Sequence, residues 1–247
     1  MPILHCTDMN QHNLAGSSYG FSAKRLDSLG ASEYTLVAVT ADVSGSVAPF
    51  RLNIETCVRE IVRACRHSPR ADNLMLRFTT FDSGVTEVHG FRPLGECDEA
   101  KYKGTIRIGG MTALYDAGHN AVEAAITYGK ALTEHDFDVN TIVFVITDGG
   151  DNSSVMTAEH LRQALERAVT SEAVESMVSI LVGVNVADPT LSRYLSDLKD
   201  KARFTQYVEL NDAREKTLAK LATFVSRSIS AQSQALGTGA ATPALTF

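Results

Sequence analysis

Three short stretches of this chain carry oxygen-bearing side chains at spacings that suit metal binding. In the first, which begins at Thr40 directly after the apolar run 34–39, Asp42, Ser44 and Ser46 occupy alternate positions. Alternate residues of an extended segment point to the same side, so these three side chains should converge. Gly45 lets the chain turn tightly there. One carboxylate and two hydroxyls then form half of an all-oxygen cup.

The other two stretches supply the remaining oxygen atoms. Thr112 ends the glycine loop Gly109-Gly-Met-Thr, and Asp148 follows the strongly apolar segment 139–147. Two carboxylates balance the charge of a divalent cation, and hard cations prefer oxygen ligands. We therefore predict a metal-ion site for Mg²⁺ in the first instance, with Mn²⁺ or Ca²⁺ as alternatives. Its predicted ligands, which together we call the cup, are Asp42, Ser44, Ser46, Thr112 and Asp148.

Strands and helices alternate along the chain, which favours a mostly parallel sheet. The strands are nearly continuous apolar runs, as expected when both faces of a sheet are covered. We expect an α/β, doubly wound fold with helices on both faces and one antiparallel edge hairpin. In such sheets, ligands bind at the carboxyl ends of the strands, where the three stretches fall. The predicted strands are 33–42, 73–81, 85–91, 139–147, 177–184 and 204–209, and the predicted helices are 49–67, 112–128, 157–173, 189–201 and 211–230.

The chain divides into three parts by composition. Residues 1–32 are polar and are expected to form an N-terminal arm with at most a short helix at Ser22–Leu29. Residues 33–232 contain the alternating elements and form the one predicted domain. Residues 233–247 are small and low in charge, and are expected to form a flexible C-terminal tail.

The three stretches resemble the metal-ion-dependent adhesion site of von Willebrand factor A (vWA) domains. The matching segments are Asp42-Val-Ser-Gly-Ser, Gly109-Gly-Met-Thr-Ala-Leu-Tyr-Asp-Ala-Gly and Val143-Phe-Val-Ile-Thr-Asp-Gly-Gly-Asp-Asn. The resemblance extends over about residues 33–230 and implies a Rossmann-like fold with an intact site. It implies that Asp42 holds the ion partly through water and that Ser44 and Ser46 bind it directly. Thr112 and Asp148 would alternate between direct and water-mediated contact.

The resemblance also implies a function. Members of the vWA family are mostly non-catalytic binding modules, in which a glutamate or aspartate of a partner protein completes the metal coordination. The intracellular bacterial members look nearest to this chain, which implies a place in a multiprotein complex for stress response or beside an ATPase. However, residues 47–53 depart from the Met-x-Gly continuation of those members. The expected partner-binding rim is Gly110, Met111, Asp151 and Asn152, although 151–152 also suit a plain solvated loop.

Two other functions fit the same residues. A vWA scaffold could hold a purely structural metal. A Mg²⁺-dependent phosphohydrolase could use Asp42 as its nucleophile, but that chemistry needs an acid two residues later, where Ser44 stands. Helix capping alone would need only one of the three residues at 42–46. The chain also lacks the GxGxxG, GxxxxGK and GxSxG patterns, so we expect no enzyme activity.

Composition excludes two classes of partner. The chain has 247 residues, a formal net charge of −6 and no dense Lys/Arg block, which argues against nucleic acid. Its apolar runs are too short to span a membrane, and the first residues lack the pattern of a secretory signal. We therefore expect a cytoplasmic protein.

Its four cysteines form no CxxC pair and suit small core positions. The oligomeric state is not indicated.

Overall fold

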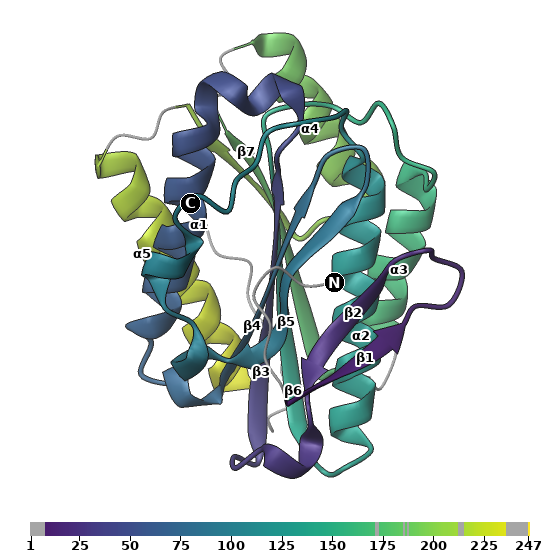
Figure 1. Cartoon of the computed structure of the whole chain (residues 1–247), viewed down its shortest axis with the longest axis vertical. Helices are drawn as coiled ribbons and strands as arrows, with labels where there is room; N and C mark the ends of the chain where they lie inside the picture. The colour runs from purple at the N-terminus through teal and green to yellow at the C-terminus, as the bar shows by residue number, and fades with distance from the viewer. Residues whose placement is uncertain (1–7, 171–172, 185, 187, 212–214, 236–246) are drawn as a thin grey trace.

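A single mixed sheet forms the centre of the fold (Figure 1). The computed structural model describes residues 8–170, 173–184, 186, 188–211, 215–235 and 247. In the sheet, the described strands follow the order β1-β2-β5-β4-β3-β6-β7-β8, and β4, β3, β6, β7 and β8 run parallel. The predicted α/β class is therefore confirmed. The strands are β1 Met9–Asn13, β2 Gly20–Lys24, β3 Glu33–Asp42, β4 Leu74–Phe81, β5 Val85–Pro93, β6 Asp138–Thr147, β7 Ser176–Val184 and β8 Gln206–Leu210.

Helices cover both faces of this sheet, as Figure 1 shows. On β3, Val37, Val39 and Ala41 belong to a core shared with α1 and α5. The alternate residues Leu36 and Ala38 belong to a second core, shared with α2, α3 and α4. Because successive residues of β3 point to opposite faces of the sheet, this strand contributes side chains to both apolar cores. The helices are α1 Arg51–Arg66, α2 Leu114–Thr133, α3 Ala158–Thr170, α4 Pro189–Ala202 and α5 Glu215–Ala235.

The predicted arm contains strands rather than a helix. The helix expected at Ser22–Leu29 is wrong, because β2 occupies Gly20–Lys24 and only Leu26–Ser28 form a 3-10 turn. The side chain of Phe21 is buried, stacks on His12 and meets Phe91 edge-on. These tertiary contacts outweigh the weak local preference of a short polar segment. β1 and β2 therefore extend the sheet, and the described part of residues 1–32 joins the same sheet as the predicted domain.

The hairpin of β4 and β5 forms as predicted, but it does not lie at the edge of the sheet. The two strands pair antiparallel around Asp82, whose side chain accepts a hydrogen bond from the amide of Gly84. Because β2 pairs with the outer side of β5, the hairpin is internal.

Helix α5 reaches Ala235, three residues into the predicted tail, and residues 236–246 of that tail lie outside the described residues.

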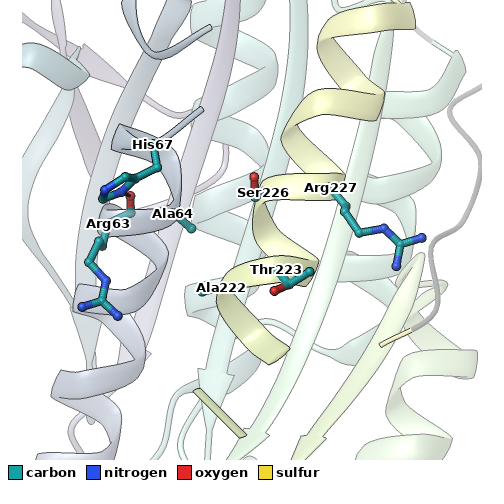
Figure 2. Close-up of a pocket in the computed structure, with 7 residues that line it drawn as sticks. All are labelled: Arg63, Ala64, His67, Ala222, Thr223, Ser226 and Arg227. Atoms are coloured by element: carbon teal, nitrogen blue, oxygen red, sulfur yellow. Dashed lines mark hydrogen bonds between the residues drawn. The ribbon is translucent and has the colours of Figure 1, made fainter. Parts of the chain in front are cut away.

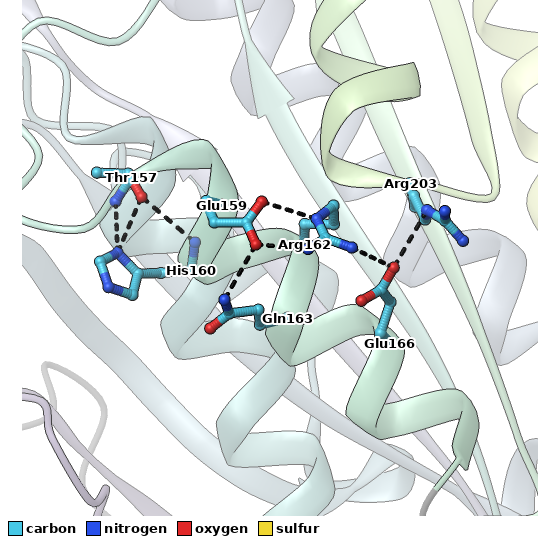
Figure 3. A network of polar contacts seen from close by, with 7 residues as sticks. All are labelled: Thr157, Glu159, His160, Arg162, Gln163, Glu166 and Arg203. Atoms are coloured by element: carbon cyan, nitrogen blue, oxygen red, sulfur yellow. Dashed lines mark hydrogen bonds and ion pairs between the residues drawn. The ribbon is translucent and has the colours of Figure 1, made fainter.

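Charged side chains on the surface of α3 connect it to the end of α4 (Figure 3). Arg162 pairs with Glu159 and Glu166 on the same helix. Glu166 also contacts Arg203 at 3.2 Å, and Arg203 ends α4 with a left-handed φ of 62°. Pairs this exposed contribute little to stability, so the network orients the two helix ends more than it stabilises the fold.

Gly90 permits the close approach of β2 to β5. A Cβ atom at this position would lie 1.9 Å from the backbone oxygen of Ser22 and 2.2 Å from its hydroxyl. We expect Gly90→Ala to lower the free energy of unfolding by about 2–3 kcal/mol, because β2 must move away from β5. Urea denaturation measures this change. Gly95→Ala is the control, since its Cβ meets nothing within 4 Å; equal midpoints for the two variants would contradict the prediction.

His89 makes stability depend on pH. Its Nδ1 donates to the carbonyl of Gly90 at 2.9 Å, and its Nε2 accepts from the Tyr102 hydroxyl at 2.7 Å. Burial, reinforced by Arg92 and Arg77 and opposed by the Gly90 hydrogen bond, lowers the pKa of His89 to about 3. The folded state therefore keeps His89 neutral at pH values where the unfolded chain, with a pKa of about 6.5, binds a proton.

This contribution to stability is complete above about pH 6.5 and is lost as the pH falls below it. We expect protonation of His89 in the unfolded chain to lower the free energy of unfolding by about 1.4 kcal/mol at pH 5.5, relative to its value well above pH 6.5. Urea denaturation at several pH values, for wild type and His89→Gln, checks the expectation. The variant should show a flatter pH dependence between 6.5 and 5.5, and parallel curves would show that other groups cause the acid sensitivity.

Candidate metal-ion site

Parallel pairing of β3 and β6 brings the two predicted carboxylates to the same edge of the sheet. Ala41 pairs with Ile146, so Asp42 and Thr147 end adjacent strands at the same level. Asp148 follows Thr147 directly. A 3-10 helix, Gly45–Phe50, begins immediately after β3 and carries Ser46. The carboxyl ends of two neighbouring strands thus supply both acids, as the sequence pattern predicts.

Asp42 is fixed by hydrogen bonds to both carboxylate oxygens. Its Oδ1 accepts from the backbone amide of Ser44 at 2.8 Å, and its Oδ2 accepts from the hydroxyl of Thr147 at 2.6 Å. The side chain is fully buried. Asp42 is therefore a rigid anchor below the cup, with its orientation set by β6 and by the turn after β3.

Ser44, Ser46 and Asp148 form a row of close oxygen atoms. The two serine hydroxyls lie 3.1 Å apart, and the hydroxyl of Ser46 donates to Oδ1 of Asp148 at 3.1 Å. Ser44 and Asp148 are buried, whereas Ser46 is exposed. The structure thus places side chains 44, 46 and 148 in one cluster that reaches the surface at Ser46.

The glycine loop lies against this cluster. The amide of Gly45 donates to the carbonyl of Gly110 at 3.2 Å, and the amide of Gly109 donates to the carbonyl of Val43 at 2.9 Å. Gly110 has a φ of 67°, and a Cβ there would lie 2.7 Å from the hydroxyl of Ser83. The loop therefore requires glycine at position 110, which serves to bring the loop against the cup.

Thr112 is joined by hydrogen bonds to Asn152, which lies on the loop after β6. The amide of Thr112 donates to the side-chain oxygen of Asn152 at 2.7 Å. In return, the carbonyl of Thr112 accepts from the amides of Asn152 and Ser153, at 3.0 and 3.2 Å. Thr112 is itself buried. Side-chain hydrogen bonds thus connect the segments of four predicted ligands, Asp42, Ser44, Ser46 and Asp148, whereas the backbone of Thr112 is bonded to the loop that follows Asp148.

The two predicted carboxylate ligands, Asp42 and Asp148, have raised pKa values in the absence of a cation. Burial, with the nearby charge of Asp42, raises the pKa of Asp148 to about 6. Burial also raises the pKa of Asp42, and Asp82 adds to this, although hydrogen bonds from Thr147 and Ser44 act in the other direction. A bound cation would remove this repulsion, because an opposite charge favours the ionised form of each acid.

The donor set fits a small divalent cation. Two ligands at right angles on an octahedral ion, each about 2.1 Å away, lie about 3 Å apart. The two spacings of 3.1 Å along the row match that requirement. Among the described residues, no group of three or more His, Cys, Asp or Glu could hold a metal. The cup is of another kind, since hydroxyls supply more than half of its predicted ligands.

The predicted rim residues have different surroundings. Met111 is 52% exposed and faces solvent beside the cup. Asp151 accepts from the amide of Tyr115 at 3.3 Å and pairs with the hydroxyl of Ser154. Asn152 holds Thr112, as described above. Met111 is therefore free to touch a partner, whereas Asp151 and Asn152 mainly fix the loops on which the rim is built.

Helix capping does not account for the polar residues of the cup. The 3-10 helix Gly45–Phe50 follows Ser44 without a side-chain capping hydrogen bond. Phe50 precedes α1 and Ala113 precedes α2, and neither of these residues forms a side-chain capping hydrogen bond. The hydroxyls at 44, 46 and 112 therefore have no capping role in the structure.

Two residues at the site were not singled out from the sequence. Thr147 binds Oδ2 of Asp42, and its position as the last residue of a strand next to β3 was the available signal. The sequence context of Asp82, Asp-Ser-Gly, indicates only a hairpin turn. It follows Phe81, which pairs with Asp42 across β3 and β4, and this pairing explains its electrostatic effect on the cup.

A separate recess lies between α1 and α5, far along α1 from the cup (Figure 2). Its volume is about 390 Å³, and its lining includes Arg63, His67 and Arg227. Figure 2 shows the two arginines directed away from each other, so they do not converge on one ligand. Arg63 is also paired with Glu60. This recess therefore does not form a second candidate binding site.

Comparison with solved structures identifies the fold as vWA-like. A point mutant of the PilB minor pilin from Streptococcus sanguinis matches with a TM-score of 0.60 at 11% identity, over 86% of this chain and 64% of that one. The pilus adhesin SpaC from Lactobacillus rhamnosus GG matches with a TM-score of 0.54 at 13% identity, over 80% and 31%. Proximal thread matrix protein 1 of the mussel byssus, with a zinc-occupied MIDAS motif, gives 0.53 at 18% identity, over 80% and 47%.

These similarities concern the fold alone, because the identities are low. The chain spans less than two thirds of the length of these three proteins. No protein-family model and no curated protein matches the sequence. Within the described residues, no helix is both long and apolar enough to cross a membrane. The structure thus supports a vWA-like module whose strand ends carry an oxygen-lined cup.

Proposed function

We propose that the chain is a non-catalytic, metal-dependent protein-interaction module. A divalent cation, Mg²⁺ in the first instance, would be held by the five cup residues, and an acidic side chain of a partner protein would bind to it. The observation that carries this proposal is the row of Ser44, Ser46 and Asp148, whose oxygen spacings suit adjacent ligands of one ion. A pilus adhesin and a matrix protein with a zinc-occupied MIDAS motif share the fold, which agrees with this function.

Each residue has a distinct task in this proposal. Asp42 orients the site from below and holds the turn that presents Ser44. The two serines would provide direct ligands, and Thr112 and Asp148 would alternate between direct and water-mediated contact. A cation held by only two acids, one of them through water, keeps positive charge. It therefore attracts a carboxylate more strongly than a site with a third acid ligand would.

Affinity capture from the native host's lysate tests the proposal. The immobilised protein is incubated with Mg²⁺ or with EDTA, and a parallel thermal scan records stability under both conditions. A protein retained only with Mg²⁺, and displaced by a glutamate-containing peptide of its own sequence, supports the proposed function. Equal retention in both lanes with a lower melting temperature in EDTA would instead indicate the scaffold with a structural metal.

The cellular setting stays a prediction. A cytoplasmic location and membership of a bacterial stress-response or ATPase-associated complex were expected from the sequence. Fractionation of the native host, followed by detection of the chain in each fraction, would test the location. The partner recovered above would test the complex.

A further inference from the structure

Two large apolar side chains are exposed on the two loops that meet at Thr112, one of the predicted ligands. Val155 is 87% exposed and Met111 is 52% exposed. Met111 directly precedes Thr112, and Val155 lies three residues after Asn152, which binds Thr112. The described residues contain few other exposed side chains of this kind, namely Leu52, Val169 and Phe247.

Hydrogen bonds join the two loops into one surface. The carbonyl of Thr112 accepts from the amides of Asn152 and Ser153. The amide of Val155 donates to Asp116 at 3.3 Å, and the amide of Met156 donates to the same carboxylate at 2.7 Å. Asp116 belongs to the first turn of α2, which begins two residues after Thr112. The backbone at Val155 is thus fixed relative to the cup.

A fixed backbone makes the exposure of Val155 informative. A valine in a loose loop could turn toward the protein, but here the amides of Val155 and Met156 fix the backbone on Asp116, and the side chain is exposed. Valine is stiff at χ1, so it presents one apolar shape. Met111 is flexible and polarizable, and such side chains adapt to varied apolar partners. Exposed apolar side chains next to a polar site are typical of interaction surfaces.

The neighbouring charge favours an acidic partner. Arg107 is exposed, stands two residues before Gly109, and forms no ion pair within the part of the chain that the structure describes. The amide of Gly109 binds the carbonyl of Val43, so the segment with Arg107 reaches the cup. An acidic segment bound there would meet a cation as well as the metal ion, and such complementarity favours correct encounter.

We propose that Met111 and Val155 form an apolar contact surface that selects the partner of the metal site. The partner segment would carry a bulky apolar residue next to the acidic residue that reaches the metal. This inference rests on the proposed function and adds the chemical class of the partner. Burial of one apolar side chain against Val155 and Met111 should strengthen binding about tenfold.

Two pools of short peptides test this selection. Both pools have a central glutamate and blocked ends; one has Leu, Ile or Phe beside the glutamate, and the other has Ser, Thr or Asn. Binding to the whole chain is measured by biolayer interferometry with Mg²⁺ and with EDTA. The readout is the ratio of the affinities for the two pools, so that a general loss of metal binding does not affect it.

The variants are Val155→Ser, Met111→Ser and the matched control Val169→Ser. Val169 is 73% exposed near the end of α3, away from the cup loops. Wild type and Val169→Ser should bind the apolar pool about tenfold more tightly in Mg²⁺, and Val155→Ser should lose most of that preference. Equal wild-type binding of both pools, or an unchanged preference in Val155→Ser, overturns the inference but leaves the proposed function in place. Absence of any Mg²⁺-dependent peptide binding overturns both.

Discussion

Replacement of Asp148 by alanine is expected to reduce Mg²⁺ affinity at least about 100-fold and to abolish Mg²⁺-dependent partner capture. Loss of a residue that only supports a metal ligand commonly costs 10–100-fold in affinity, and loss of one of the two charged ligands should cost more. Asp148 is also the acid that closes the row formed by the hydroxyls of Ser44 and Ser46. Isothermal titration of the metal-free protein with Mg²⁺ measures the change.

The same substitution should not destabilise the metal-free fold. Burial and the charge of Asp42 raise the pKa of Asp148, which means that its ionised form is unfavourable without a cation. In EDTA, the melting temperature of Asp148→Ala should therefore equal or exceed that of wild type, whereas wild type alone should gain stability with Mg²⁺. Asp27→Ala is the control, because Asp27 is exposed and pairs with Arg25 away from the cup. Wild-type Mg²⁺ affinity in Asp148→Ala would remove the cup from consideration as the metal site.

The residues of the cup could be found from the sequence because their positions follow from strand direction. Asp42 and Asp148 each follow a long apolar run, and the two runs proved to be adjacent parallel strands. Ser44 follows β3 in an extended conformation and Ser46 lies in the 3-10 helix Gly45–Phe50, and their hydrogen bonds place both hydroxyls on the side of Asp148. Local pattern and sheet topology agree here, so a short motif was sufficient to locate a three-dimensional cluster.

The parts that sequence reasoning missed depend on contacts between distant segments. The strand at Gly20–Lys24 has a short, mixed pattern, and it is defined by packing of Phe21 against Phe91 and by close approach to Gly90. The role of Asn152 depends on a hydrogen bond to Thr112, forty residues away. Neither contact has a period or a spacing that a single sequence displays. Short strands that depend on tertiary packing, and hydrogen bonds between loops, are therefore where such predictions fail.

The buried pair of Arg77 and Glu87 shows how the missed strands are attached to the sheet. Nε of Arg77 donates to Oε2 of Glu87 at 3.0 Å. The hydroxyl of Ser22 donates to Oε1 of the same glutamate at 2.6 Å, and the amide of Ser22 also donates to this carboxylate. Arg77 is only 1% exposed, and it lies on β4 while Ser22 lies on β2. One carboxylate thus bridges β2, β4 and β5.

Glu87→Ala is expected to lower the free energy of unfolding by about 3–5 kcal/mol. It leaves the buried guanidinium of Arg77 without its counter-charge, and breaking one side of a buried pair commonly has that cost. The remaining strong contact of Arg77 is the side-chain oxygen of Asn120 at 2.9 Å. Burial already lowers the pKa of Arg77 against the effect of Glu87, so its charged form depends on that partner. Urea denaturation measures the loss.

The double variant Arg77→Met/Glu87→Gln distinguishes the effect of losing the ion pair from the cost of leaving Arg77 buried without its counter-charge. Among the described residues, Nη1 of Arg77 and Nδ2 of Asn120 are buried without a hydrogen-bond partner, so the arginine is incompletely satisfied even in wild type. Replacing a buried ion pair by groups of similar shape is often close to neutral. We therefore expect the double variant to recover most of the stability lost in Glu87→Ala. If the double variant were as unstable as the single one, the cost would come from lost packing or from the contacts of Ser22, and the charge of Arg77 would not be its cause.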